Sequence, residues 1–173
     1  MRIISGKDRG RKFDAPEGAQ TRPISDRAKE GIFNMLINII DLEGAVVLDL
    51  FAGSGSFGFE CISRGAAHVN YVEKSRNAIK TLEDNIEKLG YKEQTSIHRK
   101  DVTASLVSQL EAGIVFCDPP YMDSPWPMLF SSIKSDIIVG HASSPIELGE
   151  GWRELRRRKY GRSHILICEK INN

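Results

Sequence analysis

The 173-residue sequence predicts an α/β protein built on a mostly parallel, doubly wound sheet with an antiparallel edge hairpin. Three observations predict this class. Short apolar segments rich in β-branched residues alternate with helical patterns from residue 45 onward. The first of these apolar segments ends in a glycine-rich turn, as a buried parallel strand does. The last part of the chain instead contains two strand-like segments that are joined at Gly161-Arg162, which is typical of a hairpin.

A first helix is expected after Ser25 or Asp26, either of which can cap it, because apolar residues recur at helical spacing as far as residue 40. The clearest helix spans 75–89, where the apolar residues share one face and Gly90 follows the end. The other expected helices are 56–64, 104–110 and 127–133. The expected strands are 45–50, 68–73, 95–98, 114–117, 137–139, 155–160 and 163–169. Ligands of such sheets bind beyond the carboxyl ends of the strands.

The length fits about one domain. Hydrophobic residues make up 40% and charged residues 27% of the chain, which excludes disorder, collagen and coiled coil. We expect a basic N-terminal extension over residues 1–24 and one domain over residues 25–173. The 3 cysteines form no C-x-x-C pair and the 4 histidines are widely spaced, so we expect no metal site and place the histidines at structural or surface positions. No secretory leader or membrane-length apolar segment is visible, which predicts a cytoplasmic protein.

The first candidate site is a glycine-rich loop. Gly53, Gly55 and Gly58 follow the strand at 45–50 with the G-x-G-x-x-G spacing of a dinucleotide-binding loop. Glycines there let the backbone turn tightly and approach a ligand closely. Glu73 stands about twenty residues further on, where an acid binds ribose hydroxyls. Both NAD and S-adenosylmethionine fit this stretch, and a purely structural turn is the remaining alternative.

The second candidate site distinguishes between these cofactors. Asp118, Pro119, Pro120 and Tyr121 follow the apolar strand at 114–117. Two consecutive prolines fix the backbone and leave carbonyls without neighbouring N–H donors. Such a rigid loop can direct the Asp118 carboxylate and the Pro119 carbonyl at the exocyclic amine of a nucleobase, on whose ring a tyrosine can stack. A hydride-transfer enzyme has no obvious use for this arrangement.

Residues 49–55 (DLFAGSG) and 118–121 (DPPY) resemble the S-adenosylmethionine-dependent amino-methyltransferases of nucleic acids, which have a Rossmann-like class I methyltransferase fold. Further stretches resemble the bacterial ribosomal RNA methyltransferases of the RsmD type: 2–7 (RIISGK), 10–11 (GR), 21–23 (TRP), 26–27 (DR), 63–66 (SRGA), 72–74 (VEK) and 157–161 (RRKYG). That family methylates a guanine N2 amine in the small-subunit (16S) rRNA. The segment 122–141 departs from the family pattern, because it is shorter and is broken by Pro125 and Pro127.

The resemblance implies the roles of single residues. Glu73 would bind the ribose hydroxyls of S-adenosylmethionine, and Asp101 would accept from its adenine amine. The other implied cofactor residues are Asp49, Phe51, Gly53, Gly55 and Val102. The chemistry of the loop makes Asp118, Pro119 and Tyr121 the candidate catalytic residues. The candidate substrate contacts are Arg9, Arg11 and Lys12 of the basic segment, with Pro120 and Arg22; Arg22, like Arg27, can also bind the cofactor's carboxylate or be structural. The sulfonium methyl is already electrophilic, so no metal is required.

The charge distribution bears on the partner. The net charge of +1 by itself disfavours a nucleic-acid binder, but Lys and Arg are concentrated in residues 1–12 and 153–162. We expect the first segment to contact the 16S rRNA or a small-subunit assembly intermediate. The second is either an RNA contact or a solvated edge strand. The competing hypotheses are methylation of DNA at adenine N6 or cytosine N4, an rRNA-binding assembly factor without turnover, and an NAD-dependent reductase. Whether Asp118 accepts a proton or only positions the amine stays open.

Overall fold

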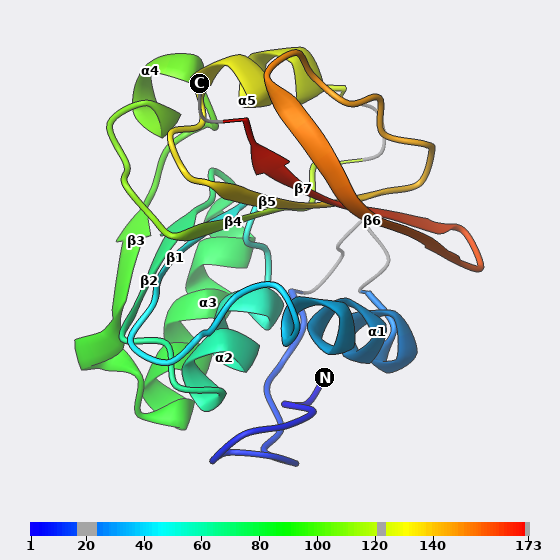
Figure 1. The fold of residues 1–173 in the computed structure, drawn as a ribbon. Coiled ribbons are helices and arrows are strands. Elements are labelled where there is room, and N and C mark those ends of the chain that lie inside the picture. The colour runs from blue at the N-terminus through cyan, green and yellow to red at the C-terminus, as the bar shows by residue number, and fades with distance from the viewer. Residues whose placement is uncertain (17–23, 121–123, 172–173) are drawn as a thin grey trace.

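A seven-stranded sheet with the order β3-β2-β1-β4-β5-β7-β6 forms the centre of the computed structural model, which describes residues 1–16, 24–120 and 124–171 (Figure 1). Strands β1 to β5 are parallel, β7 runs antiparallel to β5, and β6 runs antiparallel to β7. This arrangement confirms the predicted mostly parallel sheet with an antiparallel edge hairpin. The strands are β1 (Val46–Leu50), β2 (His68–Val72), β3 (Thr95–His98), β4 (Ile114–Cys117), β5 (Ile137–Ala142), β6 (Trp152–Tyr160) and β7 (Ser163–Lys170).

Helices cover both faces of the sheet (Figure 1). The first face packs against α1 (Asp26–Leu36), α2 (Ser56–Ser63) and α3 (Arg76–Leu89), and the second against α4 (Ala104–Val107) and α5 (Trp126–Ser132). A short 3₁₀ turn, Lys92–Gln94, precedes β3. The strand order reverses beside β1, because β2 and β4 pair with its two sides. Ligand sites of open α/β sheets form at such a switch point, at the carboxyl ends of the strands.

Local signals explain most of these elements. The hydroxyl of Ser25 accepts from the amide of Ala28 and so caps α1, while the Ser75 hydroxyl caps α3 in the same way. Gly90 ends α3 in the left-handed conformation, with φ of 72°. The four residues of β4 are all buried, as expected of a strand covered on both faces.

Four predicted boundaries are wrong by three residues or more. Helix α1 ends at Leu36 instead of near residue 40, because the chain closes into a turn there, in which the amides of Ile39 and Ile40 both donate to the Leu36 carbonyl. Helix α4 ends at Val107 instead of residue 110, because the amides of residues 109 and 110 bond three residues back and tighten the chain into a turn. Strand β5 continues to Ala142, because its pairing with β7 extends that far. Strand β6 begins at Trp152, three residues early, because a register shift between Glu154 and Arg156 breaks the alternation on which the prediction relied.

Residues 1–16 pack against the domain through their apolar side chains. Ile3 and Phe13 are each 1% exposed and belong to the same core as α1 to α3. The carboxylate of Glu60, on α2, is completely buried and accepts from the amides of Ile4 and Ser5 at 2.7 and 3.0 Å. Lys29 is also buried, with its Nζ 3.9 Å from the Glu60 carboxylate. Buried charges of this kind need partners, so this network fixes the N-terminal segment to α2.

No described helix is long and apolar enough to cross a bilayer. Within the described ranges, no group of three or more His, Cys, Asp or Glu side chains is placed to hold a metal ion.

Candidate active site

The loop after β1 adopts a left-handed backbone at three positions, a conformation that glycine tolerates best. Gly53 and Gly55 have φ of 53° and 83°, and Phe51 also has a positive φ, of 59°. A Cβ on Gly55 would lie 2.5 Å from the Leu82 side chain, so the loop packs directly on α3 there. A Cβ on Gly53 would meet only a carbonyl oxygen 3.9 Å away, so the space beside this residue is open. The loop therefore has one face packed against the protein and one face free for a ligand.

Two carboxylates hold this loop in place. Asp49, at the end of β1, is 1% exposed, and its carboxylate accepts from the amide of Gly58 at 3.0 Å, in the first turn of α2. Burial raises the pKa of Asp49 well above its usual range, and the nearby carboxylates of Asp118 and Glu73 raise it further. Glu73, after β2, accepts from the amide of Gly53 at 2.9 Å. The predicted cofactor residues Asp49, Gly53 and Glu73 therefore meet at one edge of the sheet.

Asp101 and Val102 follow β3 at the same edge. The Asp101 side chain is 56% exposed and forms an ion pair with Lys74 at 3.1 Å, next to Glu73 in the sequence. Its other oxygen accepts from the amide of Val102. Val102 is partly buried against the α4 and α5 face of the sheet. The structure thus aligns Asp101 with the loops after β1 and β2, at successive strand ends.

The loop after β4 lies directly beside the glycine loop. The amide of Asp118 is 3.5 Å from the carbonyl oxygen of Leu50, the last residue of β1. Its carboxylate oxygen Oδ1 lies 2.7 Å from Nδ1 of His141, on β5. A carboxylate oxygen only accepts, so with Asp118 ionised Nδ1 bears the proton and donates. The Asp118 side chain is 35% exposed, which leaves part of this carboxylate open to a ligand.

His141 is the residue of this site that sequence reasoning missed. Its side chain is 4% exposed, and Nε2 has no hydrogen-bond partner among the described residues. The expectation that the histidines take only structural or surface positions is thus incomplete for His141, because it contacts Asp118. The contact depends on register: Cys117 pairs with Gly140, so the residue after each lies level with the other. Pairing of neighbouring strands was the signal that could have found it.

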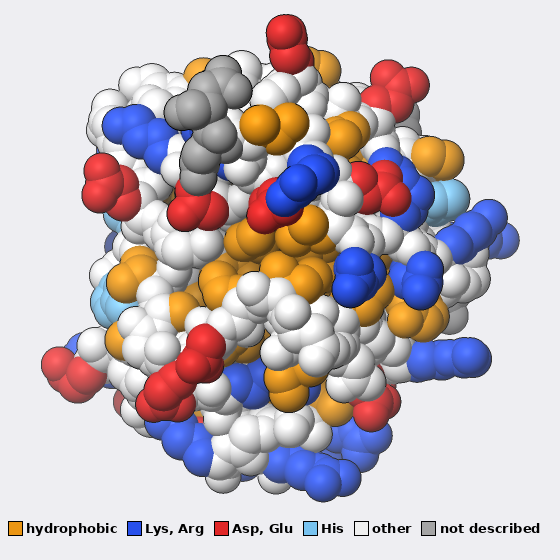
Figure 2. Space-filling view, viewed as in Figure 1, with side chains coloured by type: hydrophobic (Ala, Val, Ile, Leu, Met, Phe, Trp, Pro, Cys, Tyr) orange, Lys and Arg blue, Asp and Glu red, His pale blue; other side chains and the backbone are white. Residues whose placement is uncertain are grey.

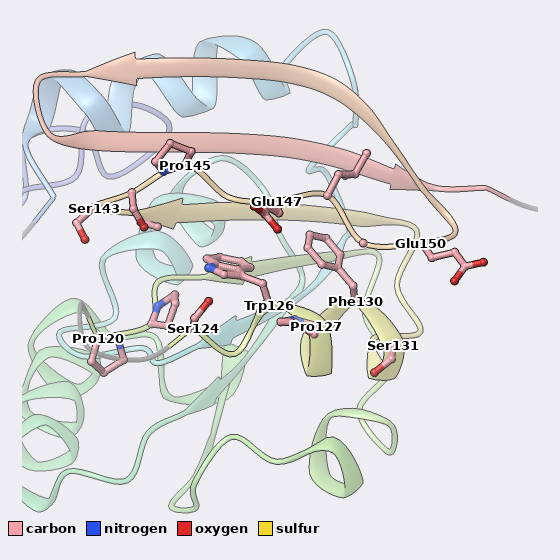
Figure 3. Close-up of a pocket in the computed structure, with 15 residues that line it drawn as sticks. Pro120, Ser124, Trp126, Pro127, Phe130, Ser131, Ser143, Pro145, Glu147 and Glu150 are labelled. Atoms are coloured by element: carbon pink, nitrogen blue, oxygen red, sulfur yellow. The ribbon is translucent and has the colours of Figure 1, made fainter.

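A cavity of about 630 Å³ begins at the prolines of this loop. It runs between α5 and the loop that follows β5, with Pro120 at one end, Trp126 and Phe130 along one wall and Glu150 at the other end (Figure 3). Trp126 is packed in the core, since it is 7% exposed and its ring centroid lies 6.2 Å from that of Phe130. The charged residues among the described lining are Glu147 and Glu150, so this cavity has an acidic rim.

The predicted RNA contacts of the N-terminal segment lie elsewhere. The guanidinium of Arg11 donates to the carbonyls of Lys88 and Leu89, at the C-terminal end of α3. That end of α3 precedes β3 and so lies toward the amino edge of the sheet, opposite the edge that holds Asp118. The side chains of Arg9 and Lys12 are exposed. Tyr121 and Arg22, two further predicted site residues, lie outside the described residues.

Comparison with known proteins now identifies the family. The family model described as "Conserved hypothetical protein 95" matches residues 1–169. A Bacillus subtilis protein, "Putative rRNA methyltransferase YlbH", is 35% identical over 98% of this chain and 99% of its own length. The chain therefore belongs to the family of this model. The Ribosomal RNA small subunit methyltransferase D of Escherichia coli is 36% identical over 70% of this chain and 60% of its own length, which confirms the RsmD-type resemblance.

Solved structures agree with this assignment. "Putative methyltransferase yhhF from Escherichia coli" has 27% identity and a TM-score of 0.82, with coverage of 98% of this chain and 97% of its own. Magnesium protoporphyrin IX methyltransferase from Synechocystis, which was solved with bound S-adenosylmethionine, has 18% identity and a TM-score of 0.64 over 83% of this chain and 78% of its own. The second match shows the fold alone. The RsmD-type family member described here therefore has the fold of S-adenosylmethionine-dependent methyltransferases.

Proposed function

We propose that this protein transfers a methyl group from S-adenosylmethionine to the exocyclic N2 amine of a guanine in small-subunit ribosomal RNA. The observation that carries this proposal is the position of Asp118, Pro119 and Pro120 directly beside the glycine loop, where the Asp118 amide lies 3.5 Å from Leu50 of β1. An amine acceptor and a cofactor loop are thereby adjacent. The names of the curated relatives support rRNA as the acceptor.

The residues of the glycine loop fit the cofactor. The open space beside Gly53 and its left-handed backbone form a cradle that a larger side chain would fill. Phe51, Gly53 and Gly55 would lie along the bound molecule, with Asp49 fixed beneath them by Gly58. Carboxylates after β2 and β3 suit the ribose hydroxyls (Glu73) and the adenine amine (Asp101), with Val102 beside the ring. Both Glu73 oxygens already accept from backbone amides, which fixes the direction of this carboxylate, and the Asp101 side chain is exposed. When bound, the cofactor supplies an electrophilic methyl group on sulfur.

The residues of the β4 loop perform the positioning. Asp118 Oδ1 is occupied by His141 at 2.7 Å, which leaves Oδ2 to accept from one N–H of the target amine. The Pro119 carbonyl accepts from the other N–H, and Tyr121 stacks on the base. Two fixed acceptors orient the nitrogen lone pair toward the methyl group. Positioning of this kind lowers the barrier by up to about 11 kcal/mol. The surplus proton leaves the methylated nitrogen for Asp118 or for water.

His141 acts through Asp118 as a positioning residue. It is held in β5 between two neighbouring strands, so its Nδ1–H fixes the rotation of the carboxylate before substrate binds. Nε2 of this ring is buried and has no hydrogen-bond partner among the described residues, and a buried polar atom without a partner costs about 1–3 kcal/mol. A ring that lowers stability in this way is explained by its role in orienting Asp118.

RNA is the partner of the proposed reaction, either as free 16S rRNA or within the small ribosomal subunit. The target base must leave its helix to reach Asp118, as in other enzymes that modify bases. Arg9, Lys12 and Arg22 stay proposed contacts, as does Pro120 at the entrance of the cavity. Arg11 keeps this role only in addition to its bonds to the end of α3.

The test is methyl transfer from labelled S-adenosylmethionine to three acceptors: naked small-subunit rRNA, small-subunit particles and duplex DNA. We expect label in the rRNA, either naked or within particles, and none in DNA. Label in DNA alone would refute the proposal and favour the DNA adenine or cytosine reaction. Tight binding of rRNA without any transfer would instead indicate an assembly factor.

A further inference from the structure

The β6–β7 hairpin projects beyond the edge of the sheet that holds the active site. The residue pairings cross four strands in one row, from β4 to β6, through Cys117, Gly140, Leu166 and Arg157. Asp118 is therefore level with Arg158, three strand spacings or about 14 Å away. Residues 159–162 continue past that row, so the turn of the hairpin lies beyond the level of the catalytic loop (Figure 1).

Positive charge is concentrated on this part of the hairpin. The side chains of Arg156, Arg158, Lys159 and Arg162 are all exposed, and none has an acidic partner among the described residues. The guanidinium groups of Arg156 and Arg158 donate instead to backbone carbonyls of the same strand. Lys and Arg side chains accordingly gather on the side of the molecule where the hairpin projects (Figure 2).

Two other arginines of β6 differ from these. Arg153 is paired with Glu169 and Arg157 with Glu154, so their charges are largely compensated. Slight burial, followed by the positive charges of Lys159 and Arg157, lowers the pKa of the nearby His164. Apart from Arg157, the cations between Arg156 and the turn thus lack an acidic partner among the described residues, and the turn lies at the active-site edge.

Helix α1 fixes the hairpin and adds a further cation. A Cβ on Gly31 would lie 2.4 Å from the Tyr160 hydroxyl oxygen, so the Tyr160 side chain packs directly on α1 at this glycine. Arg27 lies four residues before Gly31, on the same face of the helix, and its side chain is exposed. The hairpin is therefore a supported surface rather than a free ribbon, and α1 extends its positive face.

We propose that this hairpin surface, formed by Arg27, Arg156, Arg158 and Arg162, binds the phosphodiester backbone of the substrate RNA beside the target nucleotide, while Lys159 adds positive charge on the opposite face of β6. Guanidinium groups bind phosphate oxygens in a bidentate manner, which suits a row of arginines on an extended strand. The cavity that begins at Pro120 has an acidic rim. Its carboxylates repel a phosphate backbone and favour base edges that donate hydrogen bonds. The inference rests on the proposed function, because it assumes that RNA reaches Asp118.

The experiment compares two triple variants with equal loss of charge. The test variant combines Arg156→Gln, Arg158→Gln and Arg162→Gln. The control combines Lys80→Gln, Lys92→Gln and Lys134→Gln, which are all exposed and lie outside the β6–β7 hairpin and its turn. Binding of a small-subunit rRNA transcript is measured between about 50 and 200 mM salt. Loss of three phosphate contacts reduces the slope of log K against log salt by about 2 for single-stranded RNA. Wild type should therefore lose about 20-fold more affinity across this range than the test variant, and the control should match wild type.

Each result has one meaning. A shallower salt slope and a raised KM for RNA in the test variant alone support the surface. Equal slopes for test variant and wild type overturn it, and so does weaker binding to small-subunit particles with unchanged binding to naked rRNA, which would indicate a protein partner. Methyl transfer by the wild type is assayed in parallel: its absence would refute the proposed function, whereas normal transfer with equal slopes would refute the surface alone. Unchanged unfolding temperatures confirm that the variants fold.

Discussion

Replacement of His141 separates the positioning of Asp118 from the stability of the fold. His141→Leu removes the 2.7 Å hydrogen bond to the carboxylate and fills a similar volume. Hydrogen bonds to charged groups contribute about 1.5–3 kcal/mol. If this bond is needed for a correctly oriented Asp118 in the transition state, kcat should fall about 10- to 150-fold. Affinity for S-adenosylhomocysteine should stay at the wild-type value, because His141 contacts the β4 loop rather than the glycine loop.

The free energy of unfolding should respond differently. The substitution removes a buried Nε2 for which the described part of the chain offers no partner. The freed Asp118 oxygen can reach water because this side chain is 35% exposed. These two effects favour a small net change, within about 1 kcal/mol. A structural histidine would show the opposite result, with a large loss of stability and little change in kcat.

Conservative replacement and a matched control complete the test. His141→Asn places an amide N–H near the former Nδ1 and should recover most of the lost kcat. His68→Leu changes another partly buried histidine, which bonds Ser96 and begins β2 at the opposite edge of the sheet, and should leave kcat unaltered. If His141→Leu stays within about threefold of wild type in single-turnover methyl transfer, the positioning role is wrong.

Three further predictions concern the glycine loop, the buried Asp49 and the Glu60 network under the N-terminal segment. Gly55→Ala should lower the free energy of urea unfolding by about 1–3 kcal/mol, because its Cβ would lie 2.5 Å from a side chain of α3. Gly53→Ala, in open space, should lower it by about 1 kcal/mol and weaken cofactor binding in calorimetry. A larger loss of stability for Gly53→Ala than for Gly55→Ala would contradict the loop geometry. Burial raises the pKa of Asp49, so wild-type stability should fall as pH rises from the unfolded value of about 3.9 through the raised folded pKa; Asp49→Asn should remove this pH dependence, and identical pH profiles would contradict the shift. Glu60→Gln should cost about 3–5 kcal/mol because it leaves Lys29 buried beside a neutral amide, and a loss below about 1 kcal/mol would contradict the network.

The sequence was sufficient for features that depend on local patterns. Strand β4 is a continuous apolar segment, and α3 combines an apolar face with a serine cap and Gly90, so both were predicted nearly to the residue. The glycine loop and the Asp118 loop were placed correctly at strand ends, because parallel strands bring their carboxyl ends to one edge.

Features that depend on contacts between distant segments could not be read in this way. The partner of Asp118 is fixed by the pairing of β4 with β5, which no local pattern reveals. The packing of the N-terminal segment depends on the buried Glu60 carboxylate, more than fifty residues from the amides it accepts from. Likewise, the basic segment at 153–162 gave no indication of which arginines are paired, because Arg153 finds its partner on β7.

The central claim is that Asp118 presents a guanine amine to S-adenosylmethionine at the edge of this sheet. The most direct measurement is mass analysis of nucleosides from unmethylated small-subunit rRNA, naked and within particles, after incubation with S-adenosylmethionine and either the wild-type protein or Asp118→Ala. We predict N2-methylguanosine with the wild type and a near-complete loss with Asp118→Ala, which should still bind S-adenosylhomocysteine. Methylated adenosine or cytidine as the product, or undiminished N2-methylguanosine with Asp118→Ala, would contradict the account.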